Sequence, residues 1–197
     1  MTYETLLALL GFAFVTSVTP GPNNLMLMAS GANFGFRRTI PHMMGISFGF
    51  GLMCFVMGLG VVGAMLALPA TGLVLKVVSV AYMLWLAWKI AHASAPEAAA
   101  EAGRPMTFVQ AAAFQWVNPK AWTMALGAIA LYAADRSLWS LGLVAVVFTL
   151  VNLPTVSLWA MMGQGMRRWL TNPARLRAFN WTMAAALVAS LLPVLRM

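Results

Sequence analysis

Long apolar runs separated by short gaps make up most of the sequence, and this pattern limits the fold more than any other feature. A helix that spans a membrane needs about 20 consecutive, mostly apolar residues. Six stretches of the chain meet this requirement, at residues 6–32, 40–67, 73–91, 108–130, 138–162 and 179–195. The sequence therefore predicts an all-α, polytopic membrane protein with six transmembrane helices.

The composition excludes several classes of protein. Only 8% of the residues are charged and 62% are hydrophobic, whereas a soluble domain carries roughly 25% charged residues. A soluble enzyme, a disordered chain and a nucleic-acid-binding protein are therefore not expected, although the net charge is +8. The single cysteine, Cys54, lies inside an apolar run, so neither a disulfide framework nor a cysteine-rich metal site is expected.

The start of the sequence differs from a cleavable secretory signal. Such a signal has a positively charged first region and a small-residue cleavage site. This chain instead has an acid at Glu4, and no such site follows the first apolar run. We therefore expect the first run to be kept as a membrane span.

Lysine and arginine residues are concentrated in alternate gaps. The first, third and fifth gaps hold Arg37, Arg38, Lys89, Arg104, Arg167, Arg168, Arg175 and Arg177, and the opposite side holds Lys76, Arg136 and Arg196. The excess of positive charge in cytoplasmic loops places the first set in the cytoplasm and both termini outside. The basic segment 165–178 is either a helix on the membrane surface or an ordinary loop.

The two halves of the chain carry a similar break. We expect a single membrane domain in which the Ala/Glu-rich linker 92–105 separates a first repeat (about 1–91) from a second (about 106–197), each with three spans. An odd number of spans per half requires the halves to insert with opposite orientation. Prolines interrupt the first span of each half, at 19–24 and 118–120. The sequence thus predicts two inverted three-helix repeats with broken first helices.

The breaks place backbone carbonyls and polar side chains within the membrane. Proline lacks an N–H, so Pro20, Pro22 and Pro119 leave carbonyls four residues earlier without their helical partners. Irregular backbone survives in a membrane only inside protein or beside a polar cavity, and each new half-helix begins with free N–H groups. These groups could bind the ammonium and the carboxylate of an amino acid, although a proline kink without a transport role is the alternative.

The candidate substrate-binding residues are those of the two breaks and their polar neighbours. They are Thr16, Thr19, Pro20, Gly21, Pro22, Asn23, Asn24, Gln115, Asn118, Pro119 and Lys120. Lys120 stands out because a lysine within the membrane costs about 2.5–3.5 kcal/mol on insertion scales. It could pair with a carboxylate, carry a proton or hold the break together, and the alternative is that it extends to the nearby interface. Asn152, beside Pro154, either lines the same cavity or joins two helices.

Three stretches of sequence resemble a known family. They are TPGPNNLMLMASGANFGFRR at 19–38, GISFGFG at 45–51 and FQWVNPKAW at 114–122. In order and spacing they are similar to the lysine-exporter/homoserine-resistance (LysE/RhtB) family of amino-acid exporters, over nearly the whole chain. The resemblance implies a bacterial inner-membrane secondary transporter that exports amino acids or their derivatives with an ion gradient. It also implies functional roles for residues 19–24 and 118–120, and no ATP-binding GxxxxGK[ST] motif is present.

The positions of the acids bear on the coupling ion and on the substrate. Glu4, Glu97, Glu101 and Asp135 all lie at ends or in gaps, so a coupling proton would need Lys120, His42 or the substrate itself. A sodium ion bound by carbonyl, Asn and Thr oxygens would need no acid. Without an acid in the membrane, a neutral amino acid or small polar derivative is favoured over a basic one.

Other functions and partners stay open from sequence alone. The 16 methionines suggest a metal-ion exporter as an alternative, and a non-transporting membrane assembly protein is another. No set of residues typical of an enzyme site is evident, so neither catalysis nor a cofactor is expected. Glycines in the second span permit close helix approach, either within the chain or in a homodimer.

Overall fold

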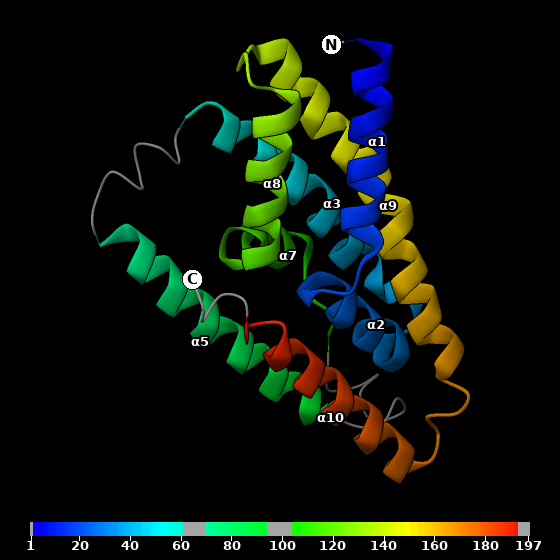
Figure 1. The fold of residues 1–197 in the computed structure, drawn as a ribbon. Helices are drawn as coiled ribbons and strands as arrows, with labels where there is room; N and C mark the ends of the chain where they lie inside the picture. The colour runs from blue at the N-terminus through cyan, green and yellow to red at the C-terminus, as the bar shows by residue number, and fades with distance from the viewer. Residues whose placement is uncertain (1, 61–69, 94–103, 193–197) are drawn as a thin grey trace.

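A computed structural model describes residues 2–60, 70–93 and 104–192, and these parts form α-helices and one 3₁₀ turn, with no strand among them (Figure 1). The predicted all-α class is therefore confirmed. Figure 1 shows an upper group of helices around α9 and a lower pair, α5 and α10, that lies obliquely beside it.

The first predicted span is broken, as the prolines indicated. Helix α1 (Tyr3–Val18) and helix α2 (Pro22–Phe34) meet at an angle of 55°. Pro22 occupies the first turn of α2, where a missing N–H has no helical partner to lose and its fixed φ favours the helix. The two prolines therefore end one helix and begin the next.

Helices α3 (Phe36–Gly58) and α5 (Thr71–Ala91) follow. Gly35 joins α2 to α3 with a φ of 81°, a backbone conformation that glycine adopts without steric cost. Helix α5 agrees with the third predicted span. The end of the second predicted span falls on residues 61–69 and lies outside the described residues.

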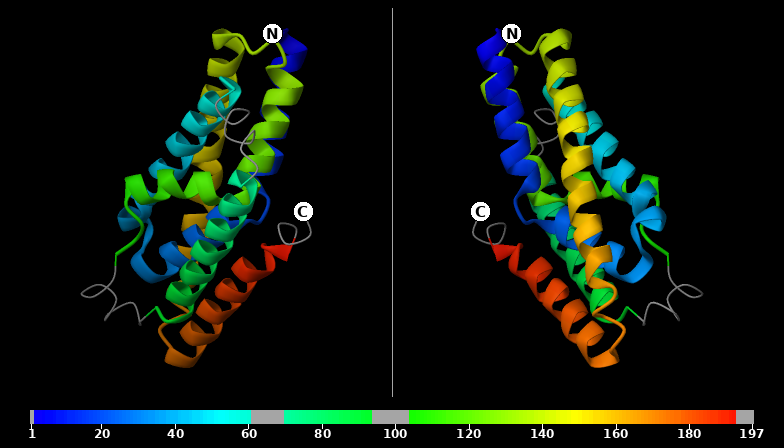
Figure 2. Two further views of the ribbon diagram at one scale, coloured as in Figure 1. Left: turned by 90° about the vertical axis from the view of Figure 1, so that its left-hand side faces the viewer. Right: turned by 90° about the vertical axis from the view of Figure 1, so that its right-hand side faces the viewer.

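The fourth predicted span is also broken. It consists of α7 (Phe108–Phe114), the 3₁₀ turn η1 (Gln115–Val117) and α8 (Pro119–Tyr132). Thr107 and Gln110 form a capping box at the start of α7. Figure 2 shows α7 lying across the long direction of the molecule, whereas α8 runs along it.

Helices α9 (Leu138–Met166) and α10 (Pro173–Ala189) complete the chain. Segment 165–178 is divided between the end of α9, turns at 167–172 and the start of α10. Pro173 begins a helix there, because Asn172 caps it by accepting hydrogen bonds from the amides of Ala174 and Arg175. The last helix therefore starts six residues before the predicted span at 179–195.

The number of spans is the least settled part of the prediction. Helices α3, α5 and α9 are each long and apolar enough to cross a membrane, and the bent pair α1 and α2 makes a fourth span if counted as one. The short α7 and α8 do not qualify separately because the break divides their span. The arrangement of six spans as two inverted repeats stays a prediction.

Helix α9 is the centre of the packing, with α1, α2 and α3 against it. The approach of α2 to α9 is close enough to need glycine. A Cβ atom added at Gly31 would collide with the carbonyl of Ala160, and one at Gly163 with the carbonyl of Met28. Small residues allow such backbone contact between membrane helices, so α2 is held rigidly although it follows a break.

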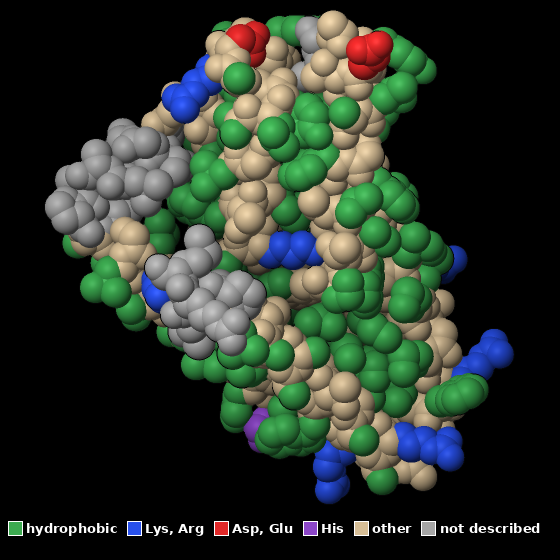
Figure 3. All heavy atoms as spheres, in the orientation of Figure 1, with side chains coloured by type: hydrophobic (Ala, Val, Ile, Leu, Met, Phe, Trp, Pro, Cys, Tyr) green, Lys and Arg blue, Asp and Glu red, His purple; other side chains and the backbone are tan. Residues whose placement is uncertain are grey.

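The charged side chains separate toward opposite ends of the molecule. Figure 3 shows the visible acidic side chains at the upper end and several Lys and Arg side chains at the lower end, where α9 is followed by α10, with other Lys and Arg side chains higher up. We call the lower end the basic end. The arginine-rich gap between α9 and α10 thus lies at this end, while the orientation of the termini in the membrane stays a prediction.

Candidate functional site

The two breaks lie against each other near the middle of the molecule. Asn23 of α2 donates a hydrogen bond through Nδ2 to Oε1 of Gln115, at 2.9 Å, and accepts one at Oδ1 from Nε2 of Gln115, at 3.2 Å. The Gln115 side chain is fully buried in η1. These paired amides join residues 92 positions apart in the sequence.

Lys120 provides a second connection between the breaks. Its Nζ donates to the carbonyl of Thr19 at 2.7 Å, to Oγ1 of Thr19 at 2.9 Å and to the carbonyl of Pro20 at 3.4 Å. The side chain passes directly over Gly21, where an added Cβ would lie 2.6 Å from Cδ of the lysine. In this conformation Lys120 of α8 therefore contacts the first break directly.

The carbonyls of the first break already have partners within the protein. The carbonyl of Thr16 accepts from Thr19 Oγ1, and the carbonyl of Val18 accepts from Trp159 Nε1. Asn24 Nδ2 donates to the carbonyls of Ser17 and Thr19. Lys120 Nζ donates to the carbonyls of Thr19 and Pro20. The carbonyls of Thr16 and Val18, from which the prolines were expected to remove the helical partners, thus accept hydrogen bonds from side chains in this conformation. An unpaired carbonyl in hydrocarbon costs several kcal/mol, so side chains from other elements take the place of the lost helical amides.

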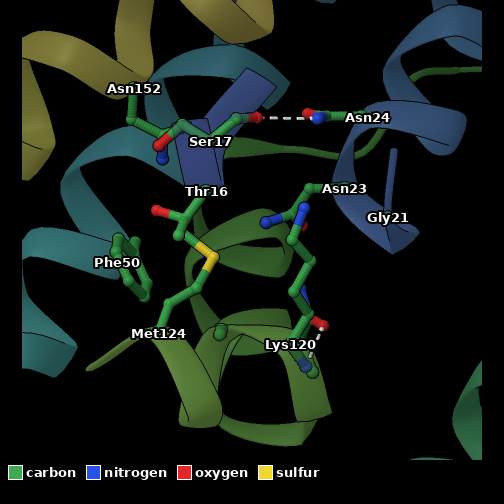
Figure 4. A pocket seen from close by; sticks show the side chains of 11 residues that line it. Thr16, Ser17, Gly21, Asn23, Asn24, Phe50, Lys120, Met124 and Asn152 are labelled. Carbon is green, nitrogen blue, oxygen red and sulfur yellow. Dashed lines mark hydrogen bonds between the residues drawn. The ribbon is translucent and has the colours of Figure 1, made fainter. Parts of the chain in front are cut away.

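A small polar cavity lies between the breaks (Figure 4). It is lined by Thr16, Ser17, Gly21, Asn23, Asn24, Phe50, Asn118, Lys120, Ala121, Met124 and Asn152, and none of these residues is acidic. We call it the central cavity. Its volume of about 20 Å³ has room for about one water molecule, so an amino acid does not fit in this conformation. The buried hydroxyl of Ser17 has no hydrogen-bond partner there and is an unused polar group at the wall.

The structure places the predicted site residues in three positions. Six line the central cavity: Thr16, Gly21, Asn23, Asn24, Asn118 and Lys120. Thr19, Pro20 and Gln115 lie next to it through their bonds to Lys120 and Asn23. Pro22 and Pro119 begin α2 and α8 and shape the backbone.

Some residues of the central cavity carry little signal in the sequence. Phe50, Ala121 and Met124 look like ordinary apolar residues of a membrane helix, and only the contacts of folded helices identify them. Asn152 lines the cavity, which was one of its two expected roles. His42, which was considered as a proton carrier, does not line it. No group of three or more His, Cys, Asp or Glu residues able to hold a metal occurs in the described part of the chain.

Comparison with known proteins places the chain in a family. The family model of the LysE type translocators matches residues 14–192. The cysteine/O-acetylserine efflux protein of Escherichia coli (strain K12) is 30% identical over 172 residues, which cover 85% of this chain and 87% of the relative. The protein of the same name from Klebsiella pneumoniae is 29% identical over 191 residues, or 95% of each chain. No solved structure matches the chain.

The family match extends over both breaks and over the residues that line the central cavity between them. Both of these relatives, which cover most of the chain, are named as cysteine/O-acetylserine efflux proteins. On this evidence the chain is a multi-pass membrane protein that belongs to the LysE type translocator family.

Proposed function

We propose that this protein exports a neutral amino acid or a small amino-acid derivative across the bacterial inner membrane, and that an ion gradient drives the export. Cysteine and O-acetylserine, which the names of the relatives give, are the first candidates. The observation that carries the proposal is the contact of the Lys120 ammonium with the carbonyls of Thr19 and Pro20 beside a polar cavity.

The chemistry of this contact matches a zwitterion. The ammonium of the substrate would replace that of Lys120 on the Thr19 and Pro20 carbonyls, and the released lysine would pair with the substrate carboxylate. Both charges of the substrate are then matched without an acidic residue. A charge-assisted hydrogen bond is about twice as strong as a neutral one, so the exchange keeps the strong interactions and changes only their partners.

The same exchange would couple binding to movement. Lys120 lies on α8 and its acceptors lie between α1 and α2, so the contact joins the two halves of the chain. A substrate that replaces this contact separates the breaks and enlarges a cavity that has room for only about one water molecule. A conformational change needs a ligand that interacts differently with the two states, and the exchange of partners at Lys120 supplies this difference.

The absence of an acid among the residues that line the central cavity supports a neutral substrate. A lysine or arginine substrate would bring a second cation close to Lys120, and like charges at short distance disfavour each other. The coupling ion is either a proton or sodium. Export of the substrate starts from the basic end, which faces the cytoplasm by the distribution of arginine and lysine, and this orientation leaves both termini outside.

The test is transport into everted membrane vesicles that contain the protein. O-acetyl-L-serine, L-cysteine and L-lysine would be compared under an imposed proton gradient, under a sodium gradient and under neither. We expect saturable transport of the two neutral compounds and little transport of lysine, with a strong reduction in Lys120→Ala and none in the control Lys76→Ala. Lack of transport of every compound under both gradients would refute the function, and unchanged transport in Lys120→Ala would refute the role of the central cavity.

A further inference from the structure

A second cavity lies toward the basic end and shares no lining residue with the central cavity. It is lined by residues of α2, α3 and α5 and of the segment just before α7, among them Ser30, Asn33, His42, Lys89 and Arg104. We call it the outer cavity. Its volume is about 110 Å³, compared with about 20 Å³ for the central cavity, so it has room for more than a single water molecule.

Two buried polar groups in the outer cavity lack hydrogen-bond partners. The side chain of His42 is only 2% exposed, and neither of its ring nitrogens has a partner. Oδ1 of the buried Asn33 has none either. A buried polar group without a partner costs about 1–3 kcal/mol, and such a group in a native fold indicates a missing ligand, ion or water. Both residues line the cavity, so its floor can bind a polar molecule.

The hydrogen-bond network identifies the unpaired atom of Asn33 as an acceptor. Its Nδ2 donates to the carbonyl of Ala29 at 2.8 Å and to Oδ1 of Asn180 at 3.2 Å. Asn180 in turn donates through its own Nδ2 to the carbonyl of Ala93. Because both carbonyls require donors, the orientations of the two amides are fixed, and Oδ1 of Asn33 is free to accept a bond from an ammonium.

The rim of the outer cavity is positively charged. Lys89 and Arg104 are exposed, and none of the described lining residues is acidic. The Lys89 ammonium lies 4.7 Å from the centre of the Trp85 ring. A cationic rim above a floor with a free acceptor and a free imidazole is complementary to a small molecule that bears both a carboxylate and an ammonium.

Helix α2 connects the two cavities. Asn23 and Asn24 line the central cavity, and Met26 and Ala29 line the outer one. These positions are separated by about one turn of the helix. A molecule in the outer cavity is therefore one helical turn from the first break, on the side of the basic end.

From these contacts we propose that the outer cavity is a loading site. It binds the carboxylate of the exported amino acid at Lys89 and Arg104 and its ammonium at Asn33, before the molecule passes along α2 to the central cavity. This inference rests on the proposed export function. The shared chemistry is a small carboxylate, which either the exported amino acid or an organic acid that is not transported could supply.

Transport kinetics with O-acetyl-L-serine, measured from each face of the membrane, would test the loading site. In everted vesicles the basic end faces outward, and we expect Arg104→Gln to raise the KM about tenfold there, as the loss of a charged contact does, with an unchanged maximal rate. In right-side-out vesicles the KM should stay the same. Arg175→Gln is the matched control, because Arg175 lies at the same end but lines neither cavity.

Two further arms separate the outcomes. Propionate, a carboxylate without an amine, should compete with O-acetyl-L-serine at the basic end in the wild type and lose this effect in Arg104→Gln. If propionate instead lowers the maximal rate and leaves KM unchanged, the cavity binds a separate acid and the loading role is overturned. His42→Asn should also raise the KM, and if that variant does not fold, Lys89→Gln replaces it.

The failure of this inference is distinct from failure of the transport function. If the wild type transports no amino acid, the proposed function itself is refuted. If the wild type transports O-acetyl-L-serine while Arg104→Gln and Lys89→Gln keep its KM, only the loading site is refuted. A KM that rises equally from both faces would also overturn it, because a loading site on one side cannot act on entry from the other.

Discussion

The two breaks satisfy their backbone groups in different ways. In the second break the partners are local: the amide of Asn118 bonds to the carbonyl of Gln115 at 3.3 Å, and the Asn118 side chain caps α8. In the first break, by contrast, the carbonyls of Val18, Thr19 and Pro20 depend on Trp159 and Lys120.

This difference follows from the prolines. A single proline at the second break leaves a 3₁₀ turn in place, whereas two prolines at the first leave an extended link whose carbonyls accept hydrogen bonds from side chains, some of them from distant helices. The first break therefore offers acceptors and the second offers the donor Lys120. Breaks at similar places in two halves thus have complementary, not equivalent, roles, and only the first has groups that a substrate could take over.

The largest expected effect is the loss of order at the first break when its donor is removed. Lys120→Met keeps the length of the side chain but leaves the carbonyls of Thr19 and Pro20 without their charged partner. Hydrogen bonds to a charged group contribute about 1.5–3 kcal/mol, so amide exchange at residues 19–25 should accelerate about 100-fold. Hydrogen exchange with mass spectrometry would measure this change in the purified protein.

If the two breaks differ in this way, Lys120→Met should accelerate hydrogen exchange at the first break and not at the second. Amides of η1 and of the start of α8 should keep their protection, because their partners are local. Lys76→Met, which removes a lysine elsewhere, is the control and should change neither segment. Equal acceleration at both breaks would show that the two support each other in the same way, and the distinction between them would have to be abandoned.

The next largest effect is expected where α2, which follows the first break, packs against α9. Gly163→Ala should lower the free energy of unfolding by about 1–3 kcal/mol, as overpacking does, because the new methyl group meets the carbonyl of Met28. Gly165→Ala on the same helix is the control, since no atom lies within 4 Å of its added Cβ. Thermal unfolding of the two variants in detergent would measure the difference.

Similar melting temperatures for the two glycine variants would contradict a rigid contact between α2 and α9. The first break would then be flexible on both sides, and Lys120 and Trp159 would be the main groups that position it. The expected result would instead show that α2 stays fixed against α9 and that only the contacts of the break itself change.

Sequence reasoning located both breaks because the effect of proline is local. A proline removes a helical hydrogen bond wherever it stands, and the prolines within polar stretches at 19–24 and 118–120 could be identified directly, whereas Pro41 and Pro154 remain inside the continuous helices α3 and α9. The pairing of Asn23 with Gln115 and of Val18 with Trp159 depends on helices that meet only in the fold. For the same reason the sequence predicted open carbonyls where the folded chain supplies donors.

The limits of sequence reasoning also appear in His42 and in the span count. His42 follows Pro41 near the start of α3, where a role at the start of the helix or at the membrane interface is the simplest interpretation. Its burial at the outer cavity, which Asn33 and Arg104 also line, is set by the packing of α2, α3 and α5. Apolar length predicted six spans, but a break inside a run leaves helices such as α7 too short to qualify alone.

A smaller effect tests the direct contact between the breaks. Asn23→Ala and Gln115→Ala should be coupled by about 0.5–1.5 kcal/mol, the contribution of an ordinary hydrogen bond, when unfolding is measured for the single and double variants. Asn23→Ala with Gln110→Ala is the control pair, because Gln110 bonds only within its own capping box. Additive effects in the first pair would mean that the amide pair does not link the breaks.

The smallest expected effect lies outside both breaks, at Asp135 between α8 and α9. Hydrogen bonds from Ser137 and Ser140 lower the pKa of this exposed carboxyl below its ordinary value. The ionised Asp135 carboxylate therefore stabilises the folded protein at pH values above the pKa of this group in the unfolded chain, about 3.9. This stabilisation is lost as the pH falls through the lower pKa of the folded state. Asp135→Asn should remove this acid dependence and leave transport at neutral pH unchanged, which melting curves from pH 7 to pH 3 and vesicle transport would measure. A loss of transport in this variant would extend the functional region beyond the breaks, and the comparison between them would no longer be sufficient to explain export.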